Sequence, residues 1–197
     1  MRAQRGFSLM EAMVTVALVG LVAAVAMPNL AETRRAVDFQ RLTKQVYADA
    51  MGCRMEALTS CRNVGLVFDE SHGRWFYTRV ADGDNDGVSR DDFRRGIDKP
   101  LGPPIWLEFL SAGTRVGVPA GWRVPDPSGS GWLPTDGLRI GNSLIMSYAR
   151  DGHATPSTVY FNDGKDRMLA IRTSGEQGRI RALLWRRGWR QWQEVRI

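Results

Sequence analysis

The longest apolar stretch of the chain is close to its N-terminus. Between Phe7 and Met27 the only ionisable side chain is Glu11. As a helix rising about 1.5 Å per residue, this stretch can cross the roughly 30 Å of hydrocarbon in a bilayer. A carboxylate inside such a helix costs about 2.5–3.5 kcal/mol by insertion scales, so it needs a partner. Cleavage after Gly6 would provide one, because the freed amine of Phe7 in one subunit can pair with Glu11 of its neighbour.

A second helical pattern follows Pro28, which lacks an amide proton and is expected to kink or weaken the helix. Beyond it, apolar residues recur at steps of three and four, and charged residues fall elsewhere. The apolar positions are Phe39, Leu42, Val46, Ala50, Cys53 and Ala57. This pattern predicts an amphipathic helix that packs its apolar face on a sheet and ends near Leu58.

Short apolar runs bounded by turn residues fill the rest of the chain. The predicted strands are residues 64–68, 75–78, 105–109, 144–148, 158–161, 168–171 and 180–184, followed by a last strand that carries Trp189 and Trp192. A long helix followed by hairpins predicts an α+β fold, in which the long N-terminal helix packs on an antiparallel β-sheet. Residues 113–134 are rich in proline and glycine and predict an extended loop. Trp122 and Trp132 in this loop either anchor a partner or cover the end of the core.

The first residues carry a family resemblance. Gly6-Phe7-Ser8-Leu9-Met10-Glu11 resembles the signature of type IV prepilins. The resemblance implies that a prepilin peptidase cuts between Gly6 and Phe7 and methylates the new N-terminus at Phe7. It also implies that Glu11, the fifth residue of the mature chain, serves in assembly with other pilin or pseudopilin subunits.

The same signature implies three segments: a leader (1–6), a transmembrane and filament-core helix (7–28) and an extracytoplasmic α+β pilin-like domain (29–197). The chain is then expected to be a single-pass protein of the bacterial inner membrane that assembles into a periplasmic or surface filament. Two other interpretations remain open, a secretory signal peptide cleaved before Met27 and a plain membrane anchor. Neither gives Glu11 a role.

Three later features resemble the GspH/FimT family of minor pilins and pseudopilins. They are the aspartate-rich loop after the second predicted strand, Gly152-His153-Ala154 before another, and Gly178-Arg179-Ile180-Arg181 near the C-terminus. This resemblance implies a non-enzymatic filament subunit at or near the tip of a type II secretion pseudopilus, with a role in protein secretion, or of a type IV pilus. In these systems the very tip subunit lacks the glutamate, so Glu11 implies a position below it. Catalysis is not expected, since His72 and His153 lie in predicted turns without a nucleophile or metal ligand at a recognisable spacing.

The aspartate-rich loop carries Asp82, Asp84, Asp86, Asp91 and Asp92. Carboxylates at alternating positions, with a glycine at the sixth, match the first half of a calcium loop. The second half departs from it, because Arg90 is at the ninth position and Phe93 at the twelfth, where a glutamate closes the site. Asp91 or Asp92 would have to substitute. The loop is therefore either a site for calcium, the one cofactor that the sequence suggests, or a solvated turn between strands.

The two cysteines, Cys53 and Cys61, raise the question of a disulfide. On an unbroken helix their Cα atoms would be about 12 Å apart, whereas a disulfide needs roughly 4.4–6.8 Å. If the helix ends near Leu58, Cys61 can fold back toward Cys53, and oxidising surroundings outside the cytoplasm favour the bridge. The alternative is a pair of buried thiols.

Positive charge is concentrated at the C-terminus. Residues 172–197 hold seven arginines against two glutamates, so five of the six net positive charges of the chain lie there. The candidates for binding are Arg179, Arg181, Arg186, Arg187 and Arg190, with tryptophans between them. Arginine pairs with phosphate and tryptophan stacks on unpaired bases, so the tail could hold DNA.

The tail also has a counterpart in the family. Gly178-Arg179-Ile180-Arg181 is similar to the Gly-Arg-x-Arg motif through which T-type minor pilins of the GspH/FimT family are thought to bind DNA. A DNA-binding minor pilin that supports DNA uptake is therefore the alternative function. Otherwise the arginines keep an edge strand soluble, stack on tryptophans within the fold, or contact an acidic neighbouring subunit.

Overall fold

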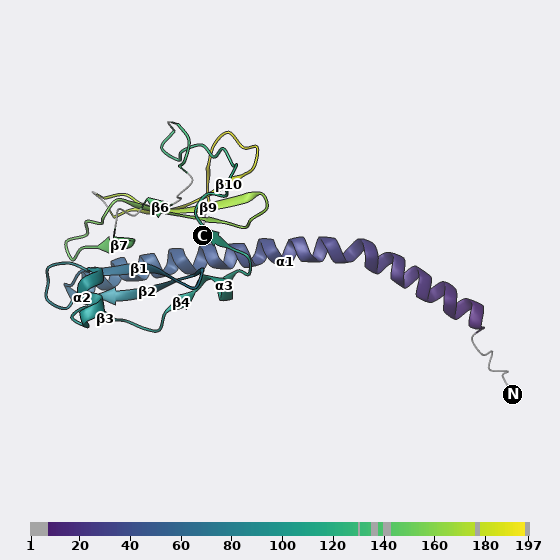
Figure 1. The fold of residues 1–197 in the computed structure, drawn as a ribbon, viewed down its shortest axis with the longest axis horizontal. Helices are drawn as coiled ribbons and strands as arrows, with labels where there is room; N and C mark the ends of the chain where they lie inside the picture. Colours follow the sequence, from purple (N-terminus) through teal and green to yellow (C-terminus); the bar gives the residue numbers. More distant parts are fainter. Residues whose placement is uncertain (1–7, 130, 135–137, 140–142, 176–177, 196–197) are drawn as a thin grey trace. The chain divides into compact units, whose positions relative to one another are not determined.

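The computed structural model describes residues 8–129, 131–134, 138–139, 143–175 and 178–195. It divides into two compact units, residues 1–37 and 38–197. In the described parts of the chain, the first helix is followed by two more helices and eleven strands (Figure 1). They are α1 (Leu9–Ser60), β1 (Val64–Ser71), β2 (Arg74–Ala81), α2 (Arg90–Arg95), β3 (Lys99–Pro100), β4 (Ile105–Trp106), α3 (Leu107–Leu110), β5 (Arg115–Val116), β6 (Leu138–Arg139), β7 (Ile145–Tyr148), β8 (Ser157–Asn162), β9 (Arg167–Thr173), β10 (Ile180–Arg186) and β11 (Gln193–Glu194).

The helix α1 is 52 residues long and belongs to both units. It continues through Pro28 without a break in its helical assignment, so the expected weakening does not end it. It stops at Ser60, close to the predicted end, and Cys61 follows in a left-handed conformation with φ of 53°.

In the second unit, the strands form two antiparallel sheets. Sheet A has the order β3-β2-β1-β7, with β4 also paired to β2, and sheet B has the order β11-β10-β9-β8-β5, with β6 paired to β8. The fourth strand of sheet A, β7, comes late in the chain, and Val64 of β1 lies opposite Tyr148 of β7. The α+β fold with a long N-terminal helix packed on antiparallel sheet is confirmed.

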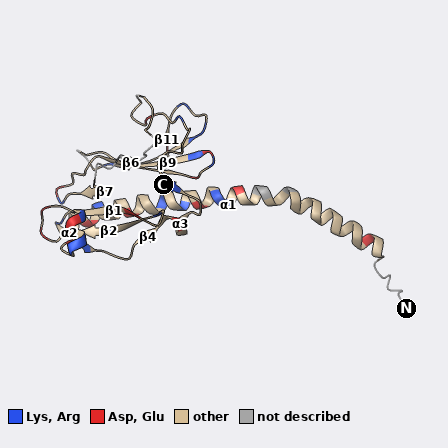
Figure 2. Cartoon of the chain, viewed as in Figure 1, with Lys and Arg blue, Asp and Glu red and all other residues tan. Residues whose placement is uncertain are grey.

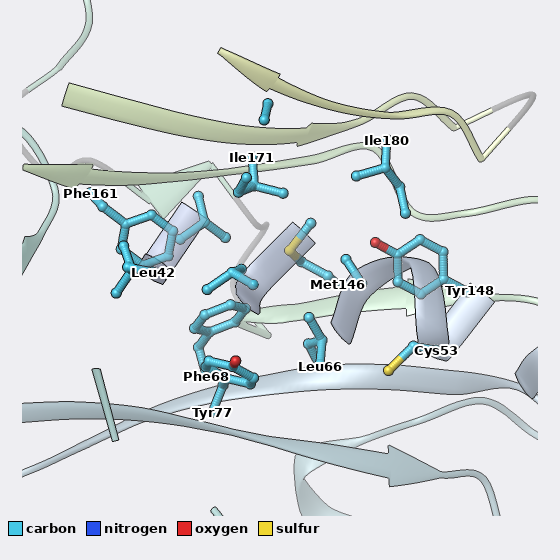
Figure 3. Close-up of a cluster of buried hydrophobic side chains, with 14 of the residues drawn as sticks. Leu42, Cys53, Leu66, Phe68, Tyr77, Met146, Tyr148, Phe161, Ile171 and Ile180 are labelled. Carbon is cyan, nitrogen blue, oxygen red and sulfur yellow. The ribbon is translucent and has the colours of Figure 1, made fainter. Parts of the chain in front are cut away.

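The main core forms where residues 38–60 of α1 pack against both sheets (Figure 3). The predicted apolar stripe of α1 is confirmed, because each of its six residues from Phe39 to Ala57 is at most 3% exposed. Figure 3 shows side chains from α1 (Leu42, Cys53), from sheet A and its strand β7 (Leu66, Phe68, Tyr77, Met146, Tyr148) and from sheet B (Phe161, Ile171, Ile180). The helix and the two sheets therefore share one core, and the helical period determines which side chains of α1 are buried in it.

A buried polar link also joins α1 to sheet A. The hydroxyl of Tyr77 donates a hydrogen bond of 2.6 Å to Asp49 Oδ2, and the amide of Gln45 donates another of 2.9 Å to the same oxygen. Burial and the hydrogen bond to Asp49 hold the pKa of Tyr77 far above its usual value. The buried carboxylate is satisfied by these donors, as a buried charge has to be.

A second cluster covers the outer face of sheet B. Residues 118–129 and 131–133 lie over this face, and Val118, Val124 and Leu133 are buried against side chains of β8, β9 and β10. Trp122 joins the cluster, so it covers the core, whereas Trp132 is 57% exposed with the Arg123 guanidinium 4.9 Å from its ring centre. The predicted extended loop is thus a packed segment that also contains β5.

Two predicted elements differ from the structure, and one helix was not predicted. The strand expected over residues 105–109 is two residues of β4 followed by the short helix α3, which leaves Phe109 80% exposed. The expected last strand with Trp189 and Trp192 is instead β11, which begins just after Trp192. The helix α2 was not predicted at all, although Ser89 caps it by accepting a hydrogen bond from the backbone of Asp92.

Candidate functional site

The first unit contains the apolar part of α1, most of which is tan in Figure 2. Its large apolar side chains are exposed: Leu9, Met10, Met13, Val14, Val16, Leu18, Val19, Leu21 and Val22 are each 52–82% exposed. A contiguous apolar surface of this kind marks contact with a membrane or with other proteins. Among the residues whose placement is described, no helix is both long enough and apolar enough to span a membrane.

Glu11 lies in the first turn of α1 and is exposed. The first turn of a helix has unpaired backbone N–H groups and the positive end of the helix dipole. Glu11 is the only acidic residue in that turn. The predicted cleavage and methylation site, Gly6 and Phe7, lies outside the described residues.

Three of the five candidate calcium ligands converge. Carboxylate oxygens of Asp82, Asp84 and Asp86 all lie within 4.8 Å of one another. Asp82 is 1% exposed, whereas Asp84 and Asp86 are exposed. Hydrogen bonding and repulsion from Asp84 raise the pKa of Asp86, as expected for crowded carboxylates.

The carboxylate of Asp82 is held in the loop by hydrogen bonds. Its Oδ1 accepts hydrogen bonds from the backbone of Asp84 and Asn85, and its Oδ2 accepts from the backbone of Gly87 and from the Asn63 side chain. Burial works against its charged form, but these hydrogen bonds outweigh it and lower the pKa of Asp82. A cation would therefore be held mainly by the two exposed aspartates.

The other two predicted ligands have different roles. Asp92 Oδ2 accepts a 2.5 Å hydrogen bond from the hydroxyl of Ser89 at the start of α2, and Asp91 lies 3.8 Å from the guanidinium of Arg94. Arg90, at the ninth position of the loop, donates to the carbonyl groups of Phe68 and Ser143 and so ties the loop to sheet A. The second half of the loop thus serves packing.

Calcium is expected to raise the melting temperature of this protein through Asp84 and Asp86. With an extracellular-type dissociation constant of about 0.5 mM, 5 mM calcium adds about 1.4 kcal/mol, or roughly 3–5 °C. Asp84→Asn should remove this gain, while Asp91→Asn, outside the cluster, should keep it. The measurement is a thermal melt of the detergent-solubilised chain with calcium or with chelator. Equal melting temperatures for the unmodified chain would leave the loop as a plain turn.

The predicted disulfide is absent from the structure. Both cysteines are free thiols, with Cys53 buried and Cys61 exposed. The reason is the length of α1: because the helix continues to Ser60, about eight helical rises of 1.5 Å separate the two residues. Burial raises the pKa of Cys53 to about 12, so this side chain stays a thiol at neutral pH.

The predicted DNA-binding arginines have different surroundings in the structure. Arg179 lies 3.9 Å from Glu194, the Arg186 guanidinium lies 5.8 Å from the ring centre of Trp189, and that of Arg187 lies 5.7 Å from the ring centre of Trp122. Arg181 and Arg190 instead line a shallow hollow on the outer face of sheet B.

A third arginine, Arg172 of β9, lines the same hollow. It was missed because the predicted strand ends at Ile171, one residue before it. The signal in the sequence is alternation: since Ile171 faces the core, the next residue points to the opposite face of the sheet. There Arg172 lies directly opposite Arg181 of β10.

Comparison with known proteins adds one finding. A family model of the prokaryotic N-terminal methylation motif matches residues 1–27. Neither curated proteins nor solved structures gave a match. The motif implies processing by a prepilin peptidase, anchoring in the inner membrane through the N-terminal segment, and assembly with pilins; proteins of this kind are generally non-enzymatic structural subunits. With the pilin-like packing of a long helix on antiparallel sheets, the motif indicates a type IV pilin-like prepilin.

Proposed function

We propose that this chain is a minor pilin or pseudopilin of the GspH/FimT kind, a subunit at or near the tip of a type II secretion pseudopilus or a type IV pilus. The observation that carries the proposal is the start of α1, where the large apolar side chains from Leu9 to Val22 are exposed and one carboxylate lies in the first turn. Inside a filament, neighbouring helices would bury this surface.

The placement of the three GspH/FimT features supports the narrower assignment. The aspartate loop directly follows β2, Gly152-His153-Ala154 precedes β8, and Gly178-Arg179-Ile180-Arg181 leads into β10. Each lies at a strand boundary in the predicted order.

Glu11 has the chemistry that assembly needs. In a low-dielectric bundle of helices, an ionised carboxylate is stable only beside a cation. The methylated amine of Phe7 in the adjoining subunit is such a cation, and pairing the two fixes the axial register between subunits. A subunit not yet docked would carry an unpaired charge, which favours docking.

The N-terminus of the mature protein tests this proposal. Mass spectrometry of protein extracted from membranes is expected to find a chain that begins at methylated Phe7. In a strain without prepilin peptidase, the chain should retain Met1 to Gly6. A mature chain that begins at Met27 would show ordinary signal-peptide cleavage and would overturn the proposal.

The alternative of DNA uptake through the C-terminal tail stays a prediction. Arg179 of the Gly-Arg-x-Arg motif is beside Glu194, which reduces its availability to phosphate, whereas Arg181 faces the hollow. A salt-dependent affinity for DNA that weakens equally on every sequence when both arginines become alanine would support it.

A further inference from the structure

The hollow on the outer face of sheet B has a volume of about 360 Å³. Residues 125–129 and Gly131 form one part of its lining, and Arg172, Arg181, Arg190 and Trp192 belong to the rest. Arg172 and Arg181 are half-buried, and Arg190 is exposed. Three cations from two strands and a turn therefore meet at one place.

Within the described part of the chain, no ion pair neutralises these three cations. No side-chain hydrogen bond or ion pair joins Arg172, Arg181 or Arg190 to any residue in the described part of the chain. Arg172 and Arg181 are moreover direct cross-strand neighbours, an arrangement in which like charges destabilise a sheet. Burying such charges in part without a partner is costly, so the arrangement favours an anion in the hollow.

The walls of the hollow are fixed in place before any ligand binds. The indole of Trp192 donates a 2.7 Å hydrogen bond to the carbonyl of Pro125, which joins the turn after β10 to the opposite wall. Asp126 Oδ1 accepts hydrogen bonds of 2.8 Å from both the backbone and the hydroxyl of Ser128, which holds that wall in a tight turn. A pre-organised site loses little entropy on binding.

The lining favours a short acidic segment over a nucleic acid. Asp126 is part of the lining, and Glu194 lies 3.9 Å from the neighbouring Arg179, so carboxylates lie among the arginines. A nucleic acid needs a continuous basic track for successive phosphates. One or two carboxylates on a peptide fit between the three guanidinium groups, each of which can bind a carboxylate with two hydrogen bonds.

The chain itself carries an acidic segment of the kind that would bind in the hollow. Asp84 and Asp86 are exposed and close together on the loop that follows β2, a strand of sheet A. Acidic and basic surfaces at different places on one subunit suit head-to-tail contacts, which build open filaments. A related subunit with a similar acidic loop would offer the same charge to the hollow.

We infer that the hollow lined by Arg172, Arg181 and Arg190 is a docking site for an acidic surface segment of the neighbouring filament subunit. This inference rests on the proposed function, because only a filament supplies such a neighbour. Contacts at the hollow would add to those of the N-terminal helices and would fix the rotation of one globular unit against the next.

A binding assay in detergent tests the chemistry. The probe is a fluorescent synthetic peptide with the sequence of residues 82–92, added to the full mature chain. Arg172→Ala with Arg181→Ala is expected to weaken binding at least tenfold, and Arg115→Ala, an exposed arginine outside the hollow, should change it less than twofold. Equal affinities for the unmodified chain and the double variant, or tighter binding of a 12-nucleotide single-stranded DNA than of the peptide, would overturn the inference.

Crosslinking in cells separates this inference from the proposed function. A photo-reactive residue at Gln191, an exposed position in the lining, is expected to crosslink to an acidic segment of another filament subunit, identified by mass spectrometry. If the chain is present in filaments but Gln191 links to no such segment, the docking site is refuted and the proposed function stands. If the chain is absent from filaments, the docking site and the proposed function are both refuted.

Discussion

Glu11→Gln is expected to leave the subunit in the inner membrane and cleaved before Phe7, but to keep it out of filaments. The amide is easier to hold in lipid than the carboxylate, so anchoring is not weakened. The amine of the neighbouring subunit, however, loses its counter-ion in a low-dielectric bundle. Removing one member of a buried pair costs about 3–5 kcal/mol, more than a hundredfold in an equilibrium constant.

The measurement is an immunoblot of filaments sheared from cells, compared with the membrane fraction. Glu70→Gln is the matched control, because it makes the same chemical change at an exposed position on β1. That variant should be incorporated as well as the unmodified chain. Equal incorporation of Glu11→Gln would remove the assembly role of this carboxylate.

Gly83→Ala is expected to destabilise the second unit by about 3 kcal/mol. A Cβ at this position would lie 2.1 Å from the carbonyl oxygen of Ile97 and 2.8 Å from its carbonyl carbon, so backbone has to move. The movement would pull on Asp98, a fully buried carboxylate that accepts hydrogen bonds from the backbone of Gly83 and Ser89. The loop that presents Asp84 and Asp86 would be disturbed as well.

Gly52→Ala provides the comparison. This glycine lies inside α1 with no heavy atom within 4 Å of an added Cβ, so alanine should stabilise the helix by about 0.5–1 kcal/mol. Thermal melts of the two variants should therefore shift in opposite directions, by roughly 6–12 °C downward and 1–4 °C upward. A melting temperature of Gly83→Ala within 2 °C of the unmodified chain would show that the segment around Ile97 adjusts freely.

The elements that could be predicted from the sequence are those with a regular pattern of apolar residues. The stripe from Phe39 to Ala57 was found because steps of three and four are visible without a structure, and the hairpin of β1 and β2 was found because two short apolar runs flank a group of turn residues. Along β10, Ile180, Ala182 and Leu184 pack in the main core and Leu183 packs on the opposite face, as alternation predicts.

Features that depend on tertiary contact were not predictable. The segment 118–133 has no period of its own, and it is ordered by the apolar outer face of sheet B. The calcium pattern left Asp91 or Asp92 to substitute for the missing glutamate, but Asp92 interacts with Ser89 at the start of α2 and Asp91 lies near Arg94. The site of three arginines depends on strand register, since only the pairing of β9 with β10 brings Arg172 beside Arg181.

The position of β7 in sheet A has a consequence for folding. Val64 pairs with Tyr148, so closing the sheet joins residues far apart in sequence, and long-range pairings of this kind form slowly because loop-closure entropy opposes them. The intervening chain supplies β5 and β6 to the other sheet, so neither sheet can be completed early. Until residue 148 emerges during synthesis, one edge of β1 is unpaired. At least three quarters of the chain must therefore be made before sheet A can close, and sheet B needs strands that come later still.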